Sequence, residues 1–117
     1  MQFDSFLTPF LERRVAVEAA HSALKAITYR DGAASLMEGY RQAAGDNEAA
    51  DITVKILEAI EKDANRPINA LTDAEAERYG RELFAVVDHR IKAENAFDRS
   101  VAQARLDDLR NDFSRIS

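Results

Sequence analysis

The feature that most constrains the fold of this chain is a helical repeat of apolar residues with few interruptions. Ile52, Ile56 and Ile60 recur at four-residue steps with Leu57 beside them, a spacing that places them on one side of an α-helix. The 117 residues include only four Gly and two Pro, so long helices can form without breaks. No stretch alternates apolar and polar residues for long enough to indicate a strand. The sequence therefore predicts an all-α protein.

Turn and capping residues divide this pattern into helices. Thr72 and Glu75 have the spacing of a capping box at the start of one helix. The first helix is predicted from Thr8-Pro9 to about Tyr29, and the second from Asp31-Gly32 to the stretch between Gly39 and Gly45. The third is predicted from Asp46-Asn47 to Asn65-Arg66-Pro67, and the fourth from Thr72 to about Glu94. The fifth is predicted to start at Asp98. The last helix has an apolar seam of Ala102, Leu106, Leu109, Phe113 and Ile116. We expect one domain over residues 1–117, a bundle of four or five antiparallel helices.

Composition excludes several function classes. The formal net charge is −5, and Arg13-Arg14 is the longest basic run, so a nucleic-acid partner is not expected. The absence of cysteine excludes disulfides, thiolate catalysis and cysteine-ligated zinc. No apolar run approaches the roughly 20 residues of a membrane span, and the first ten residues have no basic segment typical of a secretory signal. We expect a cytoplasmic protein.

A metal site is suggested only by Glu18 and His21, which have the Glu-x-x-His spacing used by di-iron helix bundles. Such a bundle needs two of these pairs and two further carboxylates. The other histidine, His89, follows Val86 at the matching position and has no acid there. One chain therefore holds half a site, and a homodimer would be needed to complete it. We expect two solvated side chains and no cofactor.

Catalytic motifs are also missing from the sequence. No serine lies in a Gly-x-Ser-x-Gly nucleophile elbow. No glycine-rich loop has the lysine and spacing of a phosphate-binding loop. We therefore expect a protein that binds and is not an enzyme.

Two surfaces are candidates for binding. Phe3, Phe6 and Phe10 lie about one helical turn apart and form either an oligomer face or part of the chain's own core, and we favour the core. Beside the isoleucine row, Leu57, Glu58 and Glu61 are expected at its edge, where an apolar residue flanked by acids would receive an amphipathic helix with a basic residue.

The run Glu77-Arg78-Tyr79-Gly80-Arg81-Glu82-Leu83-Phe84, followed by Val87-Asp88, resembles the Vta1 N-terminal domain. In that family a Glu, an aromatic residue, a small residue, Leu-Phe and an Asp recur in this order on a long helix. Residues 55–61 are similar to the family's preceding helix, and the match extends over residues 6–117. The segment after Asp88, His89 to Glu94, departs from the family's run of Asn, Glu, Asp and Arg.

The resemblance implies tandem three-helix modules that bind the tail helices of ESCRT-III subunits, with Leu57, Glu58 and Glu61 in the binding groove. We therefore expect a non-enzymatic adaptor domain that binds an amphipathic helix of a partner protein. Two alternatives stay open: a small self-associating structural or regulatory protein, and a dimeric metal-binding bundle that uses Glu18 and His21.

Overall fold

The computed structural model describes residues 3–10, 13–93 and 99–114. The helices in these ranges are α1 (Phe3–Leu7), α2 (Val15–Thr28), α3 (Ala33–Ala43), α4 (Glu48–Ala64), α5 (Asp73–Ala93) and α6 (Arg99–Ser114), with short 3-10 segments at Thr8–Phe10, Arg30–Gly32 and Ile68–Ala70. These ranges contain no strand. The prediction of an all-α bundle is confirmed.

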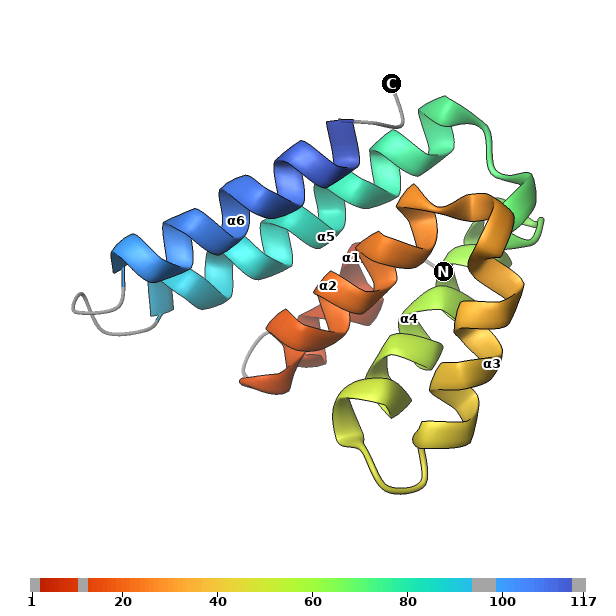
Figure 1. Ribbon diagram of the computed structural model, residues 1–117, viewed down its shortest axis with the longest axis horizontal. Helices are drawn as coiled ribbons and strands as arrows, with labels where there is room; N and C mark the ends of the chain where they lie inside the picture. Colours follow the sequence, from red (N-terminus) through yellow and green to blue (C-terminus); the bar gives the residue numbers. More distant parts are fainter. Residues whose placement is uncertain (1–2, 11–12, 94–98, 115–117) are drawn as a thin grey trace.

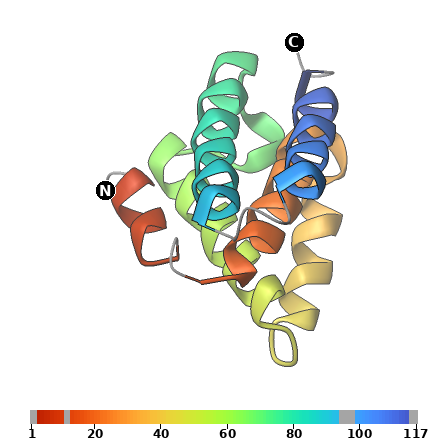
Figure 2. The same ribbon diagram turned by 90° about the vertical axis from the view of Figure 1, so that its left-hand side faces the viewer.

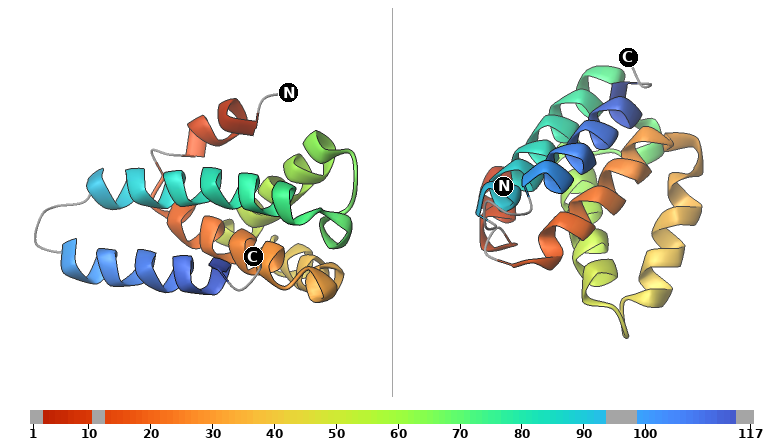
Figure 3. Two further views of the ribbon diagram at one scale, coloured as in Figure 1. Left: turned by 90° about the horizontal axis from the view of Figure 1, so that it is seen from above. Right: turned by 60° about the vertical axis from the view of Figure 1, so that its left-hand side comes forward.

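Helix α2 lies at the centre of the bundle. Helices α5 and α6 form an antiparallel pair on one side of α2, and the antiparallel pair α3 and α4 lies on the other side (Figure 1). The view turned by 90° shows α2 enclosed by these two pairs (Figure 2). Helix α1 lies on the side of α5 that faces away from α6 (Figure 3, left). Helix α1 is thus a third neighbour of α5, besides α2 and α6, and it also packs on α4.

The sequence of α2 explains its central position. Five alanines of this helix are at most 1% exposed, namely Ala16, Ala19, Ala20, Ala23 and Ala26. Small side chains let neighbouring helices come close on more than one side of α2. The neighbours supply the bulk of the core, through Ile52, Ile56 and Ile60 of α4, Tyr79, Leu83 and Val87 of α5, and Leu106 and Leu109 of α6.

The helix ends follow the capping chemistry that the sequence predicts. Asn47 precedes α4 and its Oδ1 accepts a hydrogen bond from the Ala50 N–H at 3.1 Å. Asn65 ends α4 in the left-handed conformation, with φ of 56°, which Asn tolerates better than most residues. At α5, the Thr72 N–H donates to Glu75 Oε1 at 3.0 Å, and the Glu75 N–H donates to Thr72 Oγ1 at 3.1 Å. The predicted capping box is therefore confirmed.

The predicted start of the first long helix is wrong. Thr8-Pro9 lies in a 3-10 turn, and α2 begins only at Val15. Leu7 is 3% exposed because α1 packs on the core, and the exposed pair Arg13-Arg14 before α2 supplies no apolar residue to bury there. The chain therefore changes direction between α1 and α2. The predicted cap at Asp98 lies outside the described residues.

Candidate binding groove between α1 and α5

An apolar hollow lies between the N-terminal segment and α5. It has a volume of about 420 Å³, and Leu7 and Thr8 line one side of it. The α5 side is formed by Arg81, Glu82, Ala85, Val86 and His89. These five residues fall on one face of α5, because their spacings of three and four match the helical repeat. Ala85 is exposed at the middle of this face, and its small side chain leaves the space open.

Apolar side chains form the walls of this groove. Leu7 and Val86 are almost fully buried. Next to Leu7, Phe6 and Phe10 are partly buried against the core. Their ring centroids are 5.3 Å apart at an interplanar angle of 60°, a favourable tilted arrangement. Phe6 and Phe10 thus pack on the chain's own core, the alternative that we favoured, whereas the side chain of Phe3 lies outside the described residues.

Charged residues line the solvent side of the groove. Arg81 forms an ion pair with Glu77, one turn earlier on α5. Arg78 Nε lies 3.8 Å from Glu82 Oε1, and His89 is exposed at the far end. The pair of Arg81 and Glu77 is exposed and contributes little to stability, so Arg81 can exchange partners when another surface approaches, whereas Glu82 is half-buried.

The prediction of a binding groove at Leu57, Glu58 and Glu61 is wrong for Leu57, its apolar residue. Leu57 is fully buried and cannot contact a partner in the folded protein. Glu58 is exposed, with its Oε1 3.8 Å from Arg41 Nε on α3. Glu61 is half-buried, and its Oε2 accepts a hydrogen bond from the Ile68 N–H at 3.1 Å. Helix α4 packs on both α2 and α3, so its buried face is wider than the isoleucine row, and Leu57 lies inside it.

Glu18 and His21 are both exposed on α2. His21 borders a smaller hollow between α2 and α6, which Glu18 does not line. Within residues 3–10, 13–93 and 99–114, no group of three or more His, Asp or Glu side chains comes together as metal ligands would. A metal site shared between two copies of the chain, the alternative to the expected absence of a cofactor, is not tested by these observations.

Tyr79 and Glu75, which lie outside the groove, have perturbed pKa values. Burial and a hydrogen bond to Asp63 raise the pKa of the Tyr79 phenol well above its usual range. The backbone hydrogen bond from Thr72 lowers the pKa of Glu75, and the hydroxyl of Thr72 and the nearby guanidinium groups of Arg66 and Arg78 act in the same direction. Both groups have structural partners, so these shifts follow from helix capping and core packing.

No protein-family model, curated protein or solved structure matches the chain. The resemblance to the Vta1 N-terminal domain therefore stays a prediction. Among the helices that the structure describes, none is both long and apolar enough to cross a membrane.

Proposed function

We propose that this chain is a non-enzymatic interaction domain that binds an amphipathic helix of a partner protein in the groove between α1 and α5. The observation that supports this site is the exposed Ala85, set between the buried Leu7 and Val86 in a hollow of about 420 Å³. That volume falls in the range of about 300–1,000 Å³ that is usual for ligand sites. A helix that lays apolar side chains into a groove is a recurring mode of peptide recognition.

Apolar burial would supply the affinity. Each Å² of apolar surface removed from water contributes about 25 cal/mol, before the entropy cost of association is subtracted. Ala85 leaves room for a leucine of the partner, which would lie on Ala85 and on the small exposed parts of Leu7 and Val86. The proposed partner therefore presents leucines at steps of three and four along one face.

Charge would set the register of the partner helix. Arg81 and His89 are both exposed on the α5 side of the groove, and eight residues along a helix span about 12 Å. Acidic residues at matching positions of a partner helix would pair with these two side chains. Such pairs favour selectivity and fast association more than affinity. The Vta1 resemblance implies a tail helix of an ESCRT-III subunit as the partner, whereas the charges of this groove favour a helix with acidic residues in place of the basic residue expected for the surface at Leu57, Glu58 and Glu61.

The test uses a fluorescent synthetic helix of about 20 residues, with leucines on one face and acids at its edges. Ala85→Arg places a large side chain in the groove without changing a buried residue. Ala104→Arg is the matched control, because Ala104 is also an exposed alanine within a long helix, α6, and lies outside the groove. We expect Ala85→Arg to weaken binding by at least about tenfold, equivalent to about 1.4 kcal/mol, and Ala104→Arg to leave it unchanged.

A scrambled peptide of the same composition measures non-specific binding. Equal affinity of the wild type and Ala85→Arg would reject the groove as the site. Equal affinity for the designed and scrambled peptides would reject recognition of an amphipathic helix.

Self-association is the second candidate function, favoured by the incomplete burial of Phe6 and Phe10 beside the groove. A second copy would cover these rings and the groove together. Analytical ultracentrifugation distinguishes the two functions. A monomer at all concentrations would reject self-association, and a dimer that Ala85→Arg dissociates would show that the groove is its interface.

A further inference from the structure

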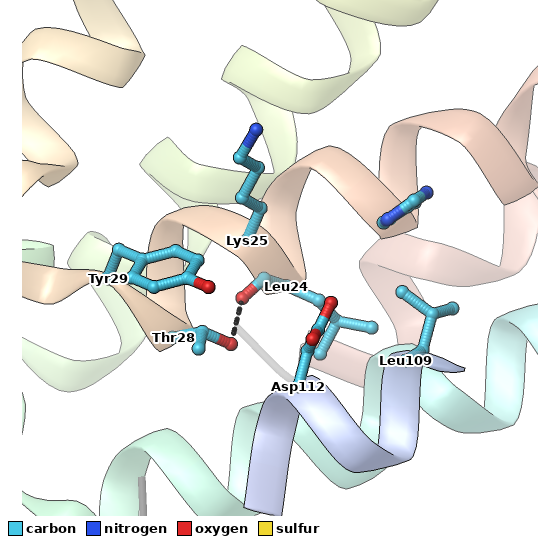
Figure 4. Close-up of a pocket in the computed structure, with 7 residues that line it drawn as sticks. Leu24, Lys25, Thr28, Tyr29, Leu109 and Asp112 are labelled. Carbon is cyan, nitrogen blue, oxygen red and sulfur yellow. Dashed lines mark hydrogen bonds between the residues drawn. The ribbon is translucent and has the colours of Figure 1, made fainter. Parts of the chain in front are cut away.

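A second hollow lies between the last two turns of α2 and the C-terminal part of α6, with a volume of about 250 Å³. Its floor is apolar, since Leu24 and Leu109 are both nearly buried. Figure 4 shows the polar side chains that surround this floor. The hollow is separate from the groove between α1 and α5 and shares no residue with it.

The polar residues of this hollow come from both helices. His21, Lys25 and Tyr29 follow one another at four-residue steps at the end of α2, and Asp112 comes from α6. Within the described residues, the side chains of these four form no hydrogen bond or ion pair. Their polar atoms are therefore available to a ligand that lies on the apolar floor, the combination that small-molecule sites use.

The charges of this hollow are divided between its two sides. Asp112 of α6 contributes a carboxylate, and Lys25 of α2 contributes an ammonium group. Figure 4 shows the Asp112 carboxylate and the Tyr29 hydroxyl turned toward the space over Leu24 and Thr28, with Lys25 extending away from Asp112. A ligand with a single charge would be attracted by one side and repelled by the other.

Helix direction favours a cation in this hollow. Helices α2 and α6 run in the same direction (Figure 1), and the hollow lies near the C-terminal end of each, at Thr28 and Ser114. Helix C-termini carry partial negative charge and favour cations. The Thr28 hydroxyl donates to the Leu24 carbonyl at 2.8 Å and can still accept a hydrogen bond. The end of the hollow near Asp112 and Tyr29 thus suits an ammonium group, whereas the positive charge that a carboxylate needs comes from Lys25 alone of the two charged side chains.

We propose that this hollow binds a small zwitterion, an α-amino acid with an aliphatic side chain. The ligand ammonium would pair with Asp112 and the Tyr29 hydroxyl, and its carboxylate with Lys25. Its aliphatic side chain would lie on Leu24 and Leu109. The volume of about 250 Å³ is below the usual range for drug-sized ligands, about 300–1,000 Å³, which fits a molecule of this size.

The test is an NMR titration of the full chain with L-leucine. Two analogues each lack one charged group: 3-methylbutylamine has no carboxylate, and 4-methylpentanoate has no ammonium. We expect leucine to shift backbone amide signals in residues 21–29 and 106–112. Each analogue should bind at least about tenfold more weakly, because it loses a charge-assisted hydrogen bond.

Asp112→Asn removes the proposed ammonium partner and keeps the shape of the side chain. Its matched control is Asp108→Asn, an exposed residue one turn earlier on α6 that does not line the hollow. We expect Asp112→Asn to weaken leucine binding by about tenfold or more, and Asp108→Asn to leave it unchanged. Lys25→Gln should weaken leucine and 4-methylpentanoate but not 3-methylbutylamine.

Three results would overturn the proposal. One is the absence of leucine-dependent shifts up to millimolar concentration. Another is equal leucine affinity of Asp112→Asn and the wild type, with both folded by circular dichroism. The third is an analogue that binds as tightly as leucine, because the site would then recognise only one charge.

Discussion

The ring of Phe113 on α6 lies directly against the backbone of Gly80 on α5, where it occupies the space that a side chain at position 80 would need. The same ring meets Phe84, one turn further along α5, in an edge-to-face contact with centroids 5.4 Å apart and planes at 86°. Gly80 therefore lets α6 approach α5 closely, and Phe113 and Phe84 hold the two helices together at this point.

The first prediction follows from this contact. Gly80→Ala should destabilise the protein by up to about 2 kcal/mol, because overpacking costs about 1–3 kcal/mol and the better helix propensity of Ala returns about 1 kcal/mol. The measurement is the midpoint of urea unfolding. In a Phe113→Leu background the cost of Gly80→Ala should shrink, since the ring that it meets is gone.

Gly39 is the matched control for this substitution. It lies inside α3, is exposed, and has no atom near the position of an added Cβ. Gly39→Ala should stabilise the protein by about 0.5–1 kcal/mol. Equal effects of the two substitutions would show that the contact between Gly80 and Phe113 is not a packing constraint.

The helices α4 and α5 and their N-terminal caps were predictable from the sequence because they depend on local spacing, whereas the start predicted at Thr8-Pro9 was wrong. The row of Ile52, Ile56 and Ile60 is buried, and the capping residues Asn47 and Thr72 have their expected partners. Local spacing does not determine how many helices pack against a given helix. It therefore predicted Leu57 at the edge of the buried face of α4, whereas the packing of α2 and α3 on α4 buries Leu57 completely.

The groove between α1 and α5 could not be predicted from the sequence for a related reason. Arg81, Ala85 and His89 form a regular row on α5, but this row resembles any partly exposed helix face. It becomes a groove only because α1 packs beside α5 and brings Leu7 near Val86. That contact joins residues almost eighty positions apart and depends on the change of chain direction before α2.

The second prediction contrasts two neighbours on α4. Leu57→Ala should destabilise the protein by about 2–5 kcal/mol, because it removes buried methyl groups and leaves a cavity. Glu58→Lys should change stability by less than about 1 kcal/mol, because its interaction with Arg41 is exposed. Urea unfolding of both variants measures the difference. Similar small effects would contradict the burial of Leu57.

The third prediction concerns the buried phenol of Tyr79. Its pKa is raised in the folded protein from the ordinary value of 10.0, so folding favours the protonated form. The corresponding stability is fully present below pH 10 and is lost as the pH rises further. Unfolding at increasing alkaline pH should therefore show a loss of stability that is smaller in Tyr79→Phe. Parallel pH profiles of the two proteins would argue against a raised pKa of Tyr79.

The fourth prediction concerns acid and the capping box at the start of α5. The Thr72 N–H bond lowers the folded pKa of Glu75 below its ordinary value of 4.5. The stability that it contributes is thus present above pH 4.5 and is lost as the pH falls through the lower folded value. The wild type should be more stable than Glu75→Gln at neutral pH, and this difference should narrow on acidification. Glu38→Gln, on the exposed face of α3, is the control and should show no such narrowing from a capping interaction.

Thr72→Ala should cost about 1 kcal/mol at neutral pH and reduce the effect of Glu75→Gln, because each substitution breaks the same reciprocal pair. Thermal unfolding between neutral and acidic pH measures the wild type, the three single variants and the double variant of Thr72→Ala and Glu75→Gln. If the effects of the two substitutions add in the double variant, Thr72 and Glu75 are not coupled.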